Sequence, residues 1–261
     1  MYGTASVIDT FLSKLETASQ SALLLDYDGT LAPFTEDRNA AFPYPEVTPL
    51  LSALMECRRT RLVMVSGRPA AEILGLIGLD PCPEIWGAHG LERLKPDGTF
   101  TAGRVDRRSA RAISDAMQWV AAQGLEDRVE RKPGGIALHW RGLDGGTVDD
   151  LAQRTISALL PLTRVSRLSL SEFDGGLELR VRSCNKGQVV EQIAREMDGA
   201  PMAYLGDDRT DEDAFRALQG RGLTVLVRRE LRPTSAESWL RPPEELADFL
   251  RLWLEACGGD A

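Results

Sequence analysis

The sequence predicts an α/β protein: a doubly wound parallel sheet with helices on both faces, interrupted by a smaller α+β module. Near both ends of the chain, short apolar runs alternate with helical patterns, a rhythm that is typical of a parallel sheet. The middle of the chain instead pairs short strands across glycine-rich turns. We therefore expect an α/β core over residues 1–102 and 183–261 and an inserted α+β module over residues 103–182.

The first part of the core is expected to contain three strands separated by helices. An amphipathic helix should precede them over residues 5–17, because apolar residues recur there at helical spacing. The elements that follow are alternately strand and helix, namely Leu23–Leu25, Val47–Arg58, Arg61–Val65, Ala70–Leu76 and Ile85–Trp86.

The last part of the core repeats this alternation, now starting from a helix. The expected order of helix and strand is Lys186–Met197, Met202–Leu205, Asp211–Leu218, Leu223–Val227 and Pro243–Glu255.

The middle of the chain reads as two helix–strand–strand units. The first has a helix over 107–123 and strands Val129–Arg131 and Ile136–Trp140, joined across Pro133-Gly134-Gly135. The second has a helix over Thr147–Leu160 and strands Arg164–Leu170 and Leu177–Val181, joined across Asp174-Gly175-Gly176. Together they predict an open antiparallel sheet with two helices.

Composition argues against several classes of partner. The formal net charge is −8, which disfavours nucleic acid. The four cysteines, Cys57, Cys82, Cys184 and Cys257, show no C-x-x-C spacing and indicate a reducing, cytoplasmic setting. We see neither a signal peptide nor an apolar stretch of about 20 residues, so no membrane association is expected. A monomer acting on a small molecule is the expectation.

The first predicted strand ends in Asp26-Tyr27-Asp28-Gly29-Thr30. Alternation along an extended chain would point Asp26 and Asp28 to one side, where two like charges are costly unless a cation neutralises them. Mg²⁺ prefers such carboxylate oxygens, and a carboxylate can also act as a nucleophile. An ordinary strand-to-turn junction is the alternative. A calcium loop is excluded, because Leu31, Ala32 and Pro33 follow instead of further oxygen ligands.

Three further motifs lie at a strand end or a helix start. Ser66-Gly67 offers a hydroxyl and a backbone N–H for phosphate, although the same residues would also suit a helix cap. Lys186 begins a helix, against the dipole preference, which favours a functional role over a solvated one. Asp207 and Asp208 directly follow a strand, at the edge where open α/β sheets bind ligands, and favour a metal over a merely acidic helix start.

In this order the four motifs resemble the haloacid dehalogenase superfamily of phosphohydrolases. The resemblance implies that Asp26 is the nucleophile and that Asp28 protonates the leaving oxygen and then activates water. It implies Mg²⁺ held by Asp26, the Asp28 carbonyl and Asp207, with Asp208 nearby. The phosphate would be bound by Ser66, Gly67, Lys186 and Thr30.

A narrower resemblance is to the trehalose-6-phosphate phosphatases. It is carried by the segments Leu25–Phe34, Gly87–Glu92, Glu130-Arg131-Lys132 with Leu138–Arg141, and Tyr204–Phe215. The chain departs from that family at Trp140, where Tyr is usual, and in Leu179–Asn185. The residues expected to bind substrate are Arg68, His89, Glu130, Lys132, His139, Arg141 and Glu178.

Two of these assignments have a structural alternative. Strand alternation puts Glu130 and Lys132 on one face, where they could bind sugar hydroxyls or form an ion pair on a solvated face. His89 could equally be a loop histidine satisfied by the backbone.

The expected function is therefore hydrolysis of trehalose 6-phosphate. Alternatives are a phosphatase for another phosphorylated glycoside, such as sucrose phosphate or a glycosylglycerate phosphate, a phosphomutase, or a non-catalytic sugar-phosphate sensor. The intact pair Asp26 and Asp28 argues against the sensor.

Overall fold

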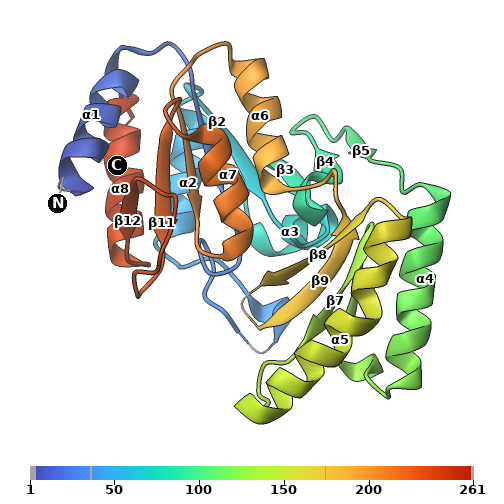
Figure 1. Cartoon of the computed structure of the whole chain (residues 1–261). Coiled ribbons are helices and arrows are strands. Elements are labelled where there is room, and N and C mark those ends of the chain that lie inside the picture. Colours follow the sequence, from blue (N-terminus) through green and yellow to red (C-terminus); the bar gives the residue numbers. More distant parts are fainter. Residues whose placement is uncertain (1–3, 36, 174, 260–261) are drawn as a thin grey trace. The chain divides into compact units, whose positions relative to one another are not determined.

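The computed structural model describes residues 4–35, 37–173 and 175–259 and confirms the predicted α/β class (Figure 1). The helices are α1 Thr4–Thr17, α2 Val47–Glu56, α3 Ala70–Ile77, α4 Arg107–Ala122, α5 Gly145–Val165, α6 Lys186–Met197, α7 Glu212–Leu218 and α8 Glu244–Ala256. The strands are β1 Ser21–Leu25, β2 Thr60–Val65, β3 Glu84–Gly87, β4 Glu92–Leu94, β5 Phe100–Ala102, β6 Val129–Lys132, β7 Gly135–His139, β8 Leu168–Phe173, β9 Gly176–Val181, β10 Met202–Gly206, β11 Leu223–Val227 and β12 Ser238–Leu240. Short 3₁₀ turns include η1 Arg38–Ala40, η2 Ala88–Gly90 and η4 Arg209–Asp211.

The chain divides into two compact units. One contains the chain up to Thr101 and from Asn185 onward, and the other contains Ala102–Cys184. The first unit is built on an eight-stranded sheet in the order β12-β11-β10-β1-β2-β3-β4-β5. Strand β1 runs parallel to both β10 and β2. The carboxyl ends of these three strands therefore meet at one edge of the sheet, which is where ligands bind in open α/β sheets.

Both faces of this sheet are covered, which explains why β1 is apolar from Ala22 to Leu25. Leu23 and Leu25 pack with α1, α2, α3 and α8 on one face, whereas Ala22 and Leu24 pack with α6 and α7 on the other. A parallel strand buried on both faces has no polar alternation, so its sequence is a continuous hydrophobic run.

The second unit is a four-stranded antiparallel sheet in the order β6-β7-β9-β8, with α4 and α5 on one face. Apolar residues on that face, including Ile136, Leu168 and Leu179, pack against Ala116 and Val120 of α4 and Leu159 of α5. The opposite face carries the alternate residues of each strand, among them the charged Glu130, Lys132 and Glu178.

The strand predicted over Arg164–Leu170 is wrong in its first part. Helix α5 continues through Pro161 to Val165, and the strand begins only at Leu168. Proline removes one donor from the helix ladder, but Pro161 and Ser157, whose carbonyl loses its partner, are both exposed, so water can replace the bond. Asp174, in the turn predicted between the following strands, lies outside the described residues.

Three strands were not anticipated: β4, β5 and β12. Each has three residues, which is too short for an alternation pattern to emerge. Among the described helices, none has the length and apolar character required to cross a membrane.

Candidate active site

Asp26 lies directly after β1 at the carboxyl edge of the sheet and is buried. Its backbone N–H donates to the Leu205 carbonyl at 2.9 Å, which continues the pairing with β10 past the end of the strand. The ammonium of Lys186 donates to Asp26 Oδ1 at 2.6 Å. The sequence-predicted nucleophile and the sequence-predicted phosphate-binding lysine are therefore in direct contact, although 160 positions separate them.

Lys186 is the first residue of α6, a position that the helix dipole disfavours for a cation. The helix can begin there because Asn185 caps it, its side chain accepting from the Gln188 N–H at 2.9 Å. Lys186 Nζ donates to Asp211 Oδ1 at 2.8 Å as well as to Asp26. Burial acts to lower the pKa of Lys186, but the carboxylates of Asp211 and Asp26 outweigh it and raise the pKa, so the side chain stays charged.

Asp211 organises the acidic turn after β10, and we did not predict its role. It is fully buried, and Oδ1 accepts from Lys186 and from the Tyr204 hydroxyl at 2.6 Å. Oδ2 accepts from the backbone N–H groups of Asp207 and Asp208 at 3.1 and 2.9 Å. The spacing Asp208-x-x-Asp211, which forms a capping box here, was the signal in the sequence.

Three carboxylates converge in this turn. Oxygen atoms of Asp26, Asp207 and Asp211 all lie within 4.8 Å of one another. The predicted metal set contained Asp208 instead of Asp211. In the structure Asp208 Oδ1 accepts from the Arg209 N–H at 2.6 Å and caps η4, outside this group of three.

The environment of Asp207 fits a divalent cation. Both of its carboxylate oxygens are buried and neither has a hydrogen-bond partner among the described residues. Burial, and then the charges of Asp26 and Asp211, raise its pKa well above the ordinary value. Burial, followed by Asp211, also raises the pKa of Asp26 to about 7, against the opposing charge of Lys186. Mg²⁺ prefers hard oxygen ligands, and here the negative charge of the carboxylates exceeds the positive charge around them.

Gly29 allows the first turn to approach Asp207. Its φ is +84°, and a Cβ at this position would lie 2.2 Å from Asp207 Oδ2. Only glycine satisfies both conditions without strain. The Asp26–Thr30 turn and the Asp207 turn are thereby packed against each other.

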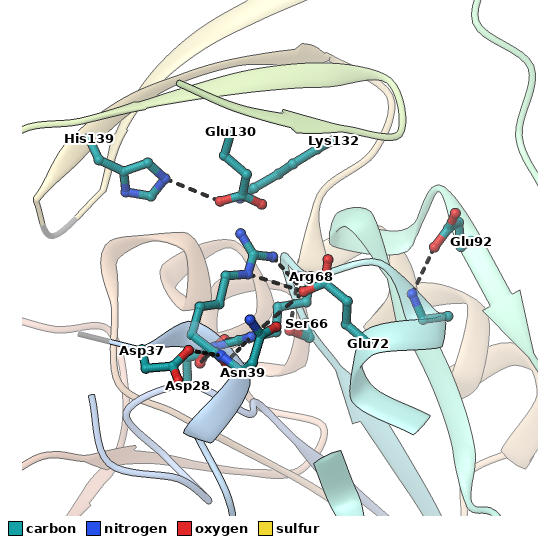
Figure 2. Close-up of polar contacts among 12 residues, drawn as sticks. Asp28, Asp37, Asn39, Ser66, Arg68, Glu72, Glu92, Glu130, Lys132 and His139 are labelled. Atoms are coloured by element: carbon teal, nitrogen blue, oxygen red, sulfur yellow. Dashed lines mark hydrogen bonds and ion pairs between the residues drawn. The ribbon is translucent and has the colours of Figure 1, made fainter. Parts of the chain in front are cut away.

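The Asp28 carboxylate is held by Arg68, which the sequence assigned to substrate. Arg68 Nε and a terminal nitrogen donate to the two Asp28 oxygens at 2.7 and 2.6 Å (Figure 2). Another Arg68 nitrogen donates to the Arg38 carbonyl at 2.8 Å. Such a bidentate pair fixes both the direction and the tilt of a carboxylate. Arg68 thus orients Asp28, a contact that spacing along the chain could not indicate.

Ser66 directly follows β2 and therefore lies at the same edge of the sheet as Asp26, which follows the neighbouring strand β1. Ser66 Oγ accepts from the Arg68 N–H at 3.1 Å, and the Ser66 carbonyl accepts from the His89 N–H at 2.9 Å. His89 is buried with its ring against Gly67, where a Cβ would lie 2.7 Å from Nε2. Thr30 is fully buried, and its hydroxyl has no hydrogen-bond partner among the described residues, so it is available to a ligand.

In the second unit, four of the predicted sugar-binding residues lie on the polar face of the sheet. Lys132 Nζ donates to Glu178 Oε1 at 3.0 Å and lies 3.9 Å from Glu130 Oε1. His139 Nε2 is 3.1 Å from Glu130 Oε2 (Figure 2). Lys132 of β6 can reach Glu178 of β9 because the β7 residues between them on this face are Gly135 and Ala137, which have small side chains or none.

Two residues that we did not predict extend this polar face. Arg180 Nε lies 3.4 Å from Glu178 Oε2. The Phe173 ring packs edge-on against His139, with centroids 5.3 Å apart, and the Lys132 ammonium is 6.0 Å from its centroid. Arg141, the remaining predicted residue, follows β7 and is exposed.

Sequence comparison finds relatives over most of the chain. The profile of the family described as trehalose-phosphatase matches residues 24–240. A trehalose-phosphate phosphatase of Mycobacterium avium is 32% identical over 92% of this chain and 67% of its own length. A probable trehalose-phosphate phosphatase H of Arabidopsis thaliana is 28% identical over 96% of this chain and 77% of its own length. A trehalose-phosphate phosphatase of Mycobacterium marinum is 31% identical over 89% of this chain, which spans 61% of that relative.

Solved structures show the same fold. The C-terminal domain of Candida albicans trehalose-6-phosphate phosphatase has a TM-score of 0.82 at 21% identity, covering 95% of this chain and 96% of that one. A haloacid dehalogenase-like hydrolase from B. subtilis has a TM-score of 0.63 at 14% identity, covering 88% and 98%. At these identities the similarity establishes the fold, a haloacid dehalogenase-like core with an inserted module.

Proposed function

Because this chain belongs to the trehalose-phosphatase family of phosphoric monoester hydrolases, we propose that it is a Mg²⁺-dependent phosphatase acting through an aspartyl-phosphate on Asp26. Its proposed substrate is trehalose 6-phosphate, and its products are trehalose and inorganic phosphate. The observation that carries the proposal is the buried contact of 2.6 Å between Lys186 and Asp26, beside the unpartnered carboxylate of Asp207.

In the first step an Asp26 oxygen attacks phosphorus, and the bond between phosphorus and the sugar oxygen breaks. Asp28 gives its proton to that leaving oxygen. Lys186, charged and held between Asp26 and Asp211, stabilises the negative charge of the phosphoryl oxygens. Thr30, Ser66 and Gly67 supply further donors to these oxygens.

In the second step water attacks phosphorus and the bond to Asp26 breaks. Asp28, now ionised, accepts a proton from the water, and inorganic phosphate leaves. Arg68 orients the ionised Asp28 carboxylate in this second step, when both of its oxygens can accept from the guanidinium.

Asp26, the Asp28 backbone carbonyl and Asp207 would hold Mg²⁺, with Asp208 and Asp211 behind them. When bound, the cation supplies charge neutralisation for the carboxylates and polarises the phosphoryl group. Without it, the three buried carboxylates are neutralised only in part, as the raised pKa values of Asp207 and Asp26 indicate.

Residues 103–182 are proposed to act as a cap that recognises the disaccharide. Glu130, Lys132 and Glu178 present charged groups that suit sugar hydroxyls, and His139 lies beside Glu130. Arg141, which follows β7, is a further proposed contact. Arg68 and His89 remain predicted substrate contacts. We further propose a cytoplasmic monomer, in keeping with four cysteines that form no disulfide.

The test is release of inorganic phosphate from a panel of phosphorylated sugars. Trehalose 6-phosphate should be turned over faster than sucrose phosphate or a glycosylglycerate phosphate, EDTA should abolish activity, and Mg²⁺ should restore it. Asp26→Asn should lower kcat by at least about 10³-fold, whereas Asp9→Asn, on the exposed side of α1, should not. Binding without release would identify a sensor, and transfer of phosphate to another sugar position would identify a mutase.

A further inference from the structure

The connection between β11 and β12, residues 228–237, contains no helix, although the two strands it joins are parallel. It starts at the carboxyl edge of the sheet, next to the Asp207 turn, and carries two arginines that reach this turn. Arg232 contacts its backbone and Arg228 contacts its carboxylate. Neither residue belongs to any of the four motifs that predict the catalytic site.

Arg232 binds the carbonyl groups of the acidic turn. Its Nε and one terminal nitrogen each lie 3.2 Å from the Asp207 carbonyl, and the same terminal nitrogen donates to the Asp208 carbonyl at 2.8 Å. The other terminal nitrogen donates to Glu212 Oε1 at 2.6 Å. A planar guanidinium that engages two successive carbonyls fixes the peptide planes of the turn, and so the direction in which the Asp207 side chain leaves.

The rest of the connection is anchored so that Arg232 is held in place. Glu212, at the start of α7, accepts from the Thr234 hydroxyl and from the Ser235 N–H, both at 2.8 Å. Trp239 Nε1 donates to the Arg228 carbonyl at 2.7 Å. An irregular segment without a helix is thereby fixed at both of its ends.

Arg228 acts on the carboxylate itself. A terminal nitrogen lies 3.9 Å from Asp207 Oδ2, too far for a hydrogen bond but close enough for a strong charge interaction. Arg228 forms an ion pair with Asp207, whose oxygens have no hydrogen-bond partner among the described residues, and the charge of Lys186 acts on the same carboxylate. A divalent cation on Asp207 would lie a few ångströms from this positive charge and be repelled by it.

We infer that the 228–237 connection sets the affinity of Asp207 for its divalent cation through two arginines of opposite effect. Arg232 is a positioning residue that strengthens binding by holding the turn, and Arg228 weakens binding by competing for the same carboxylate. The inference rests on the proposed function, since it assumes the cation, but it concerns two residues outside the four motifs of the site.

The test is Mg²⁺ binding to the metal-stripped full chain, measured by isothermal titration calorimetry without substrate. Arg232→Gln should raise the Kd about tenfold, as expected for losing charge-assisted bonds to the turn. Arg228→Gln should lower the Kd about threefold or more, because it removes a nearby positive charge. Arg216→Gln is the matched control, since Arg216 pairs with Asp213 on the exposed side of α7 and its loss changes net charge equally.

A second measurement separates positioning from general damage. With excess Mg²⁺, the kcat of Arg232→Gln should return close to that of the wild type, whereas a misfolded variant would stay inactive. If Arg232→Gln does not fold, Arg228→Gln still tests the inference. The Arg228 side chain is one-third exposed, so its replacement should be tolerated, and the predicted change in Kd has the opposite sign.

The inference is overturned if Arg228→Gln leaves Mg²⁺ binding unchanged or weakens it, or if folded Arg232→Gln binds as tightly as the wild type. It is equally overturned if Arg216→Gln tightens binding as much as Arg228→Gln, because net charge alone would then explain the result. A wild-type chain that binds no Mg²⁺ would instead contradict the proposed function.

Discussion

At the scale of single residues, the two oxygens of Asp211 have divided roles. Oδ2 fixes the backbone of the acidic turn, and Oδ1 is shared between the Tyr204 hydroxyl and Lys186. The position of Lys186 relative to Asp26 therefore depends on how strongly Asp211 attracts it. Tyr204 lies in the buried strand β10 and adjusts that attraction by supplying a competing donor.

Tyr204→Phe removes this donor, and Lys186 should then move towards Asp211 and away from Asp26. We expect kcat to fall about tenfold while KM changes little, because a buried charge-assisted contact is lost from the phosphoryl transfer step. Steady-state kinetics on trehalose 6-phosphate would measure this.

Tyr27→Phe is the matched control for that experiment. Tyr27 is also fully buried and its hydroxyl donates to the Ala41 carbonyl at 2.8 Å, so its loss should lower stability similarly without lowering kcat. Equal turnover by the two variants would show that Tyr204 has only a packing role.

Asp26 links stability to pH in the metal-free protein. Burial and Asp211 raise its folded-state pKa from 3.8 to about 7. Between these values the folded state binds more protons than the unfolded state, so this group's contribution to the free energy of unfolding falls as pH rises towards 7. Asp26→Asn removes the effect. In EDTA, the melting temperature of the variant should exceed that of the wild type by a margin that grows from pH 5 to pH 8.

The comparison needs a variant with an equal change in charge. Asp115→Asn, on an exposed position of α4, should shift the melting temperature by the same small amount at every pH. A margin for Asp26→Asn that stays constant with pH would show that Asp26 is not perturbed in the folded state.

The sequence could indicate which residues stand at strand ends, but not where their side chains point. Asp26, Ser66 and Asp207 were predictable because each directly follows a buried strand. The roles of Asp211 and Arg68 depend on rotamers and on partners more than 20 positions away, such as Lys186 for Asp211 and Asp28 for Arg68. Lys186 was predictable only because its place at a helix start conflicts with the dipole.

At the scale of elements, the polar face of the β6-β7-β9-β8 sheet combines ion pairs with small residues. Lys132 contacts Glu130 on its own strand and Glu178 across β7, whose side chains there are absent or a single methyl group. Strand alternation predicted that Glu130 and Lys132 share a face. The partner Glu178 was assigned from resemblance, because pairing of β7 with β9 spans about 40 residues that a local pattern does not connect.

Removing Glu130 or Lys132 separates specificity from chemistry. If they bind the sugar, Glu130→Ala and Lys132→Ala should each lower kcat/KM for trehalose 6-phosphate about ten- to a hundredfold, since buried polar groups on the ligand lose partners. Hydrolysis of p-nitrophenyl phosphate should barely change, because that ester has no sugar.

Arg131→Ala supplies the control for these two variants. Arg131 stands between them on β6, points to the opposite face and is exposed, so neither substrate should be affected. Equal losses on both substrates in the Glu130 and Lys132 variants would mean that the ion pairs are structural.

At the scale of the whole molecule, the alternation of strand and helix was enough to predict the α/β class. It identified the three strands whose ends carry the site, because runs such as Leu23–Leu25 are apolar on both faces. It could not identify β12, which is three residues long and exists as a strand because β11 pairs with it. Nor could it place the end of α5, because whether Pro161 ends the helix depends on solvent exposure.

The crossing from the second unit back to the first is very short. The second unit ends at Cys184, Asn185 caps α6, and Lys186 follows at once. The other crossing continues from Ala102 into residues 103–105, which belong to neither helix nor strand. A different module could therefore be grafted onto this core by adjusting the linker at 103–105. No such linker exists at the crossing back to the first unit, because Asn185 caps α6 and an insertion after it would separate Lys186 from its cap at the start of the helix.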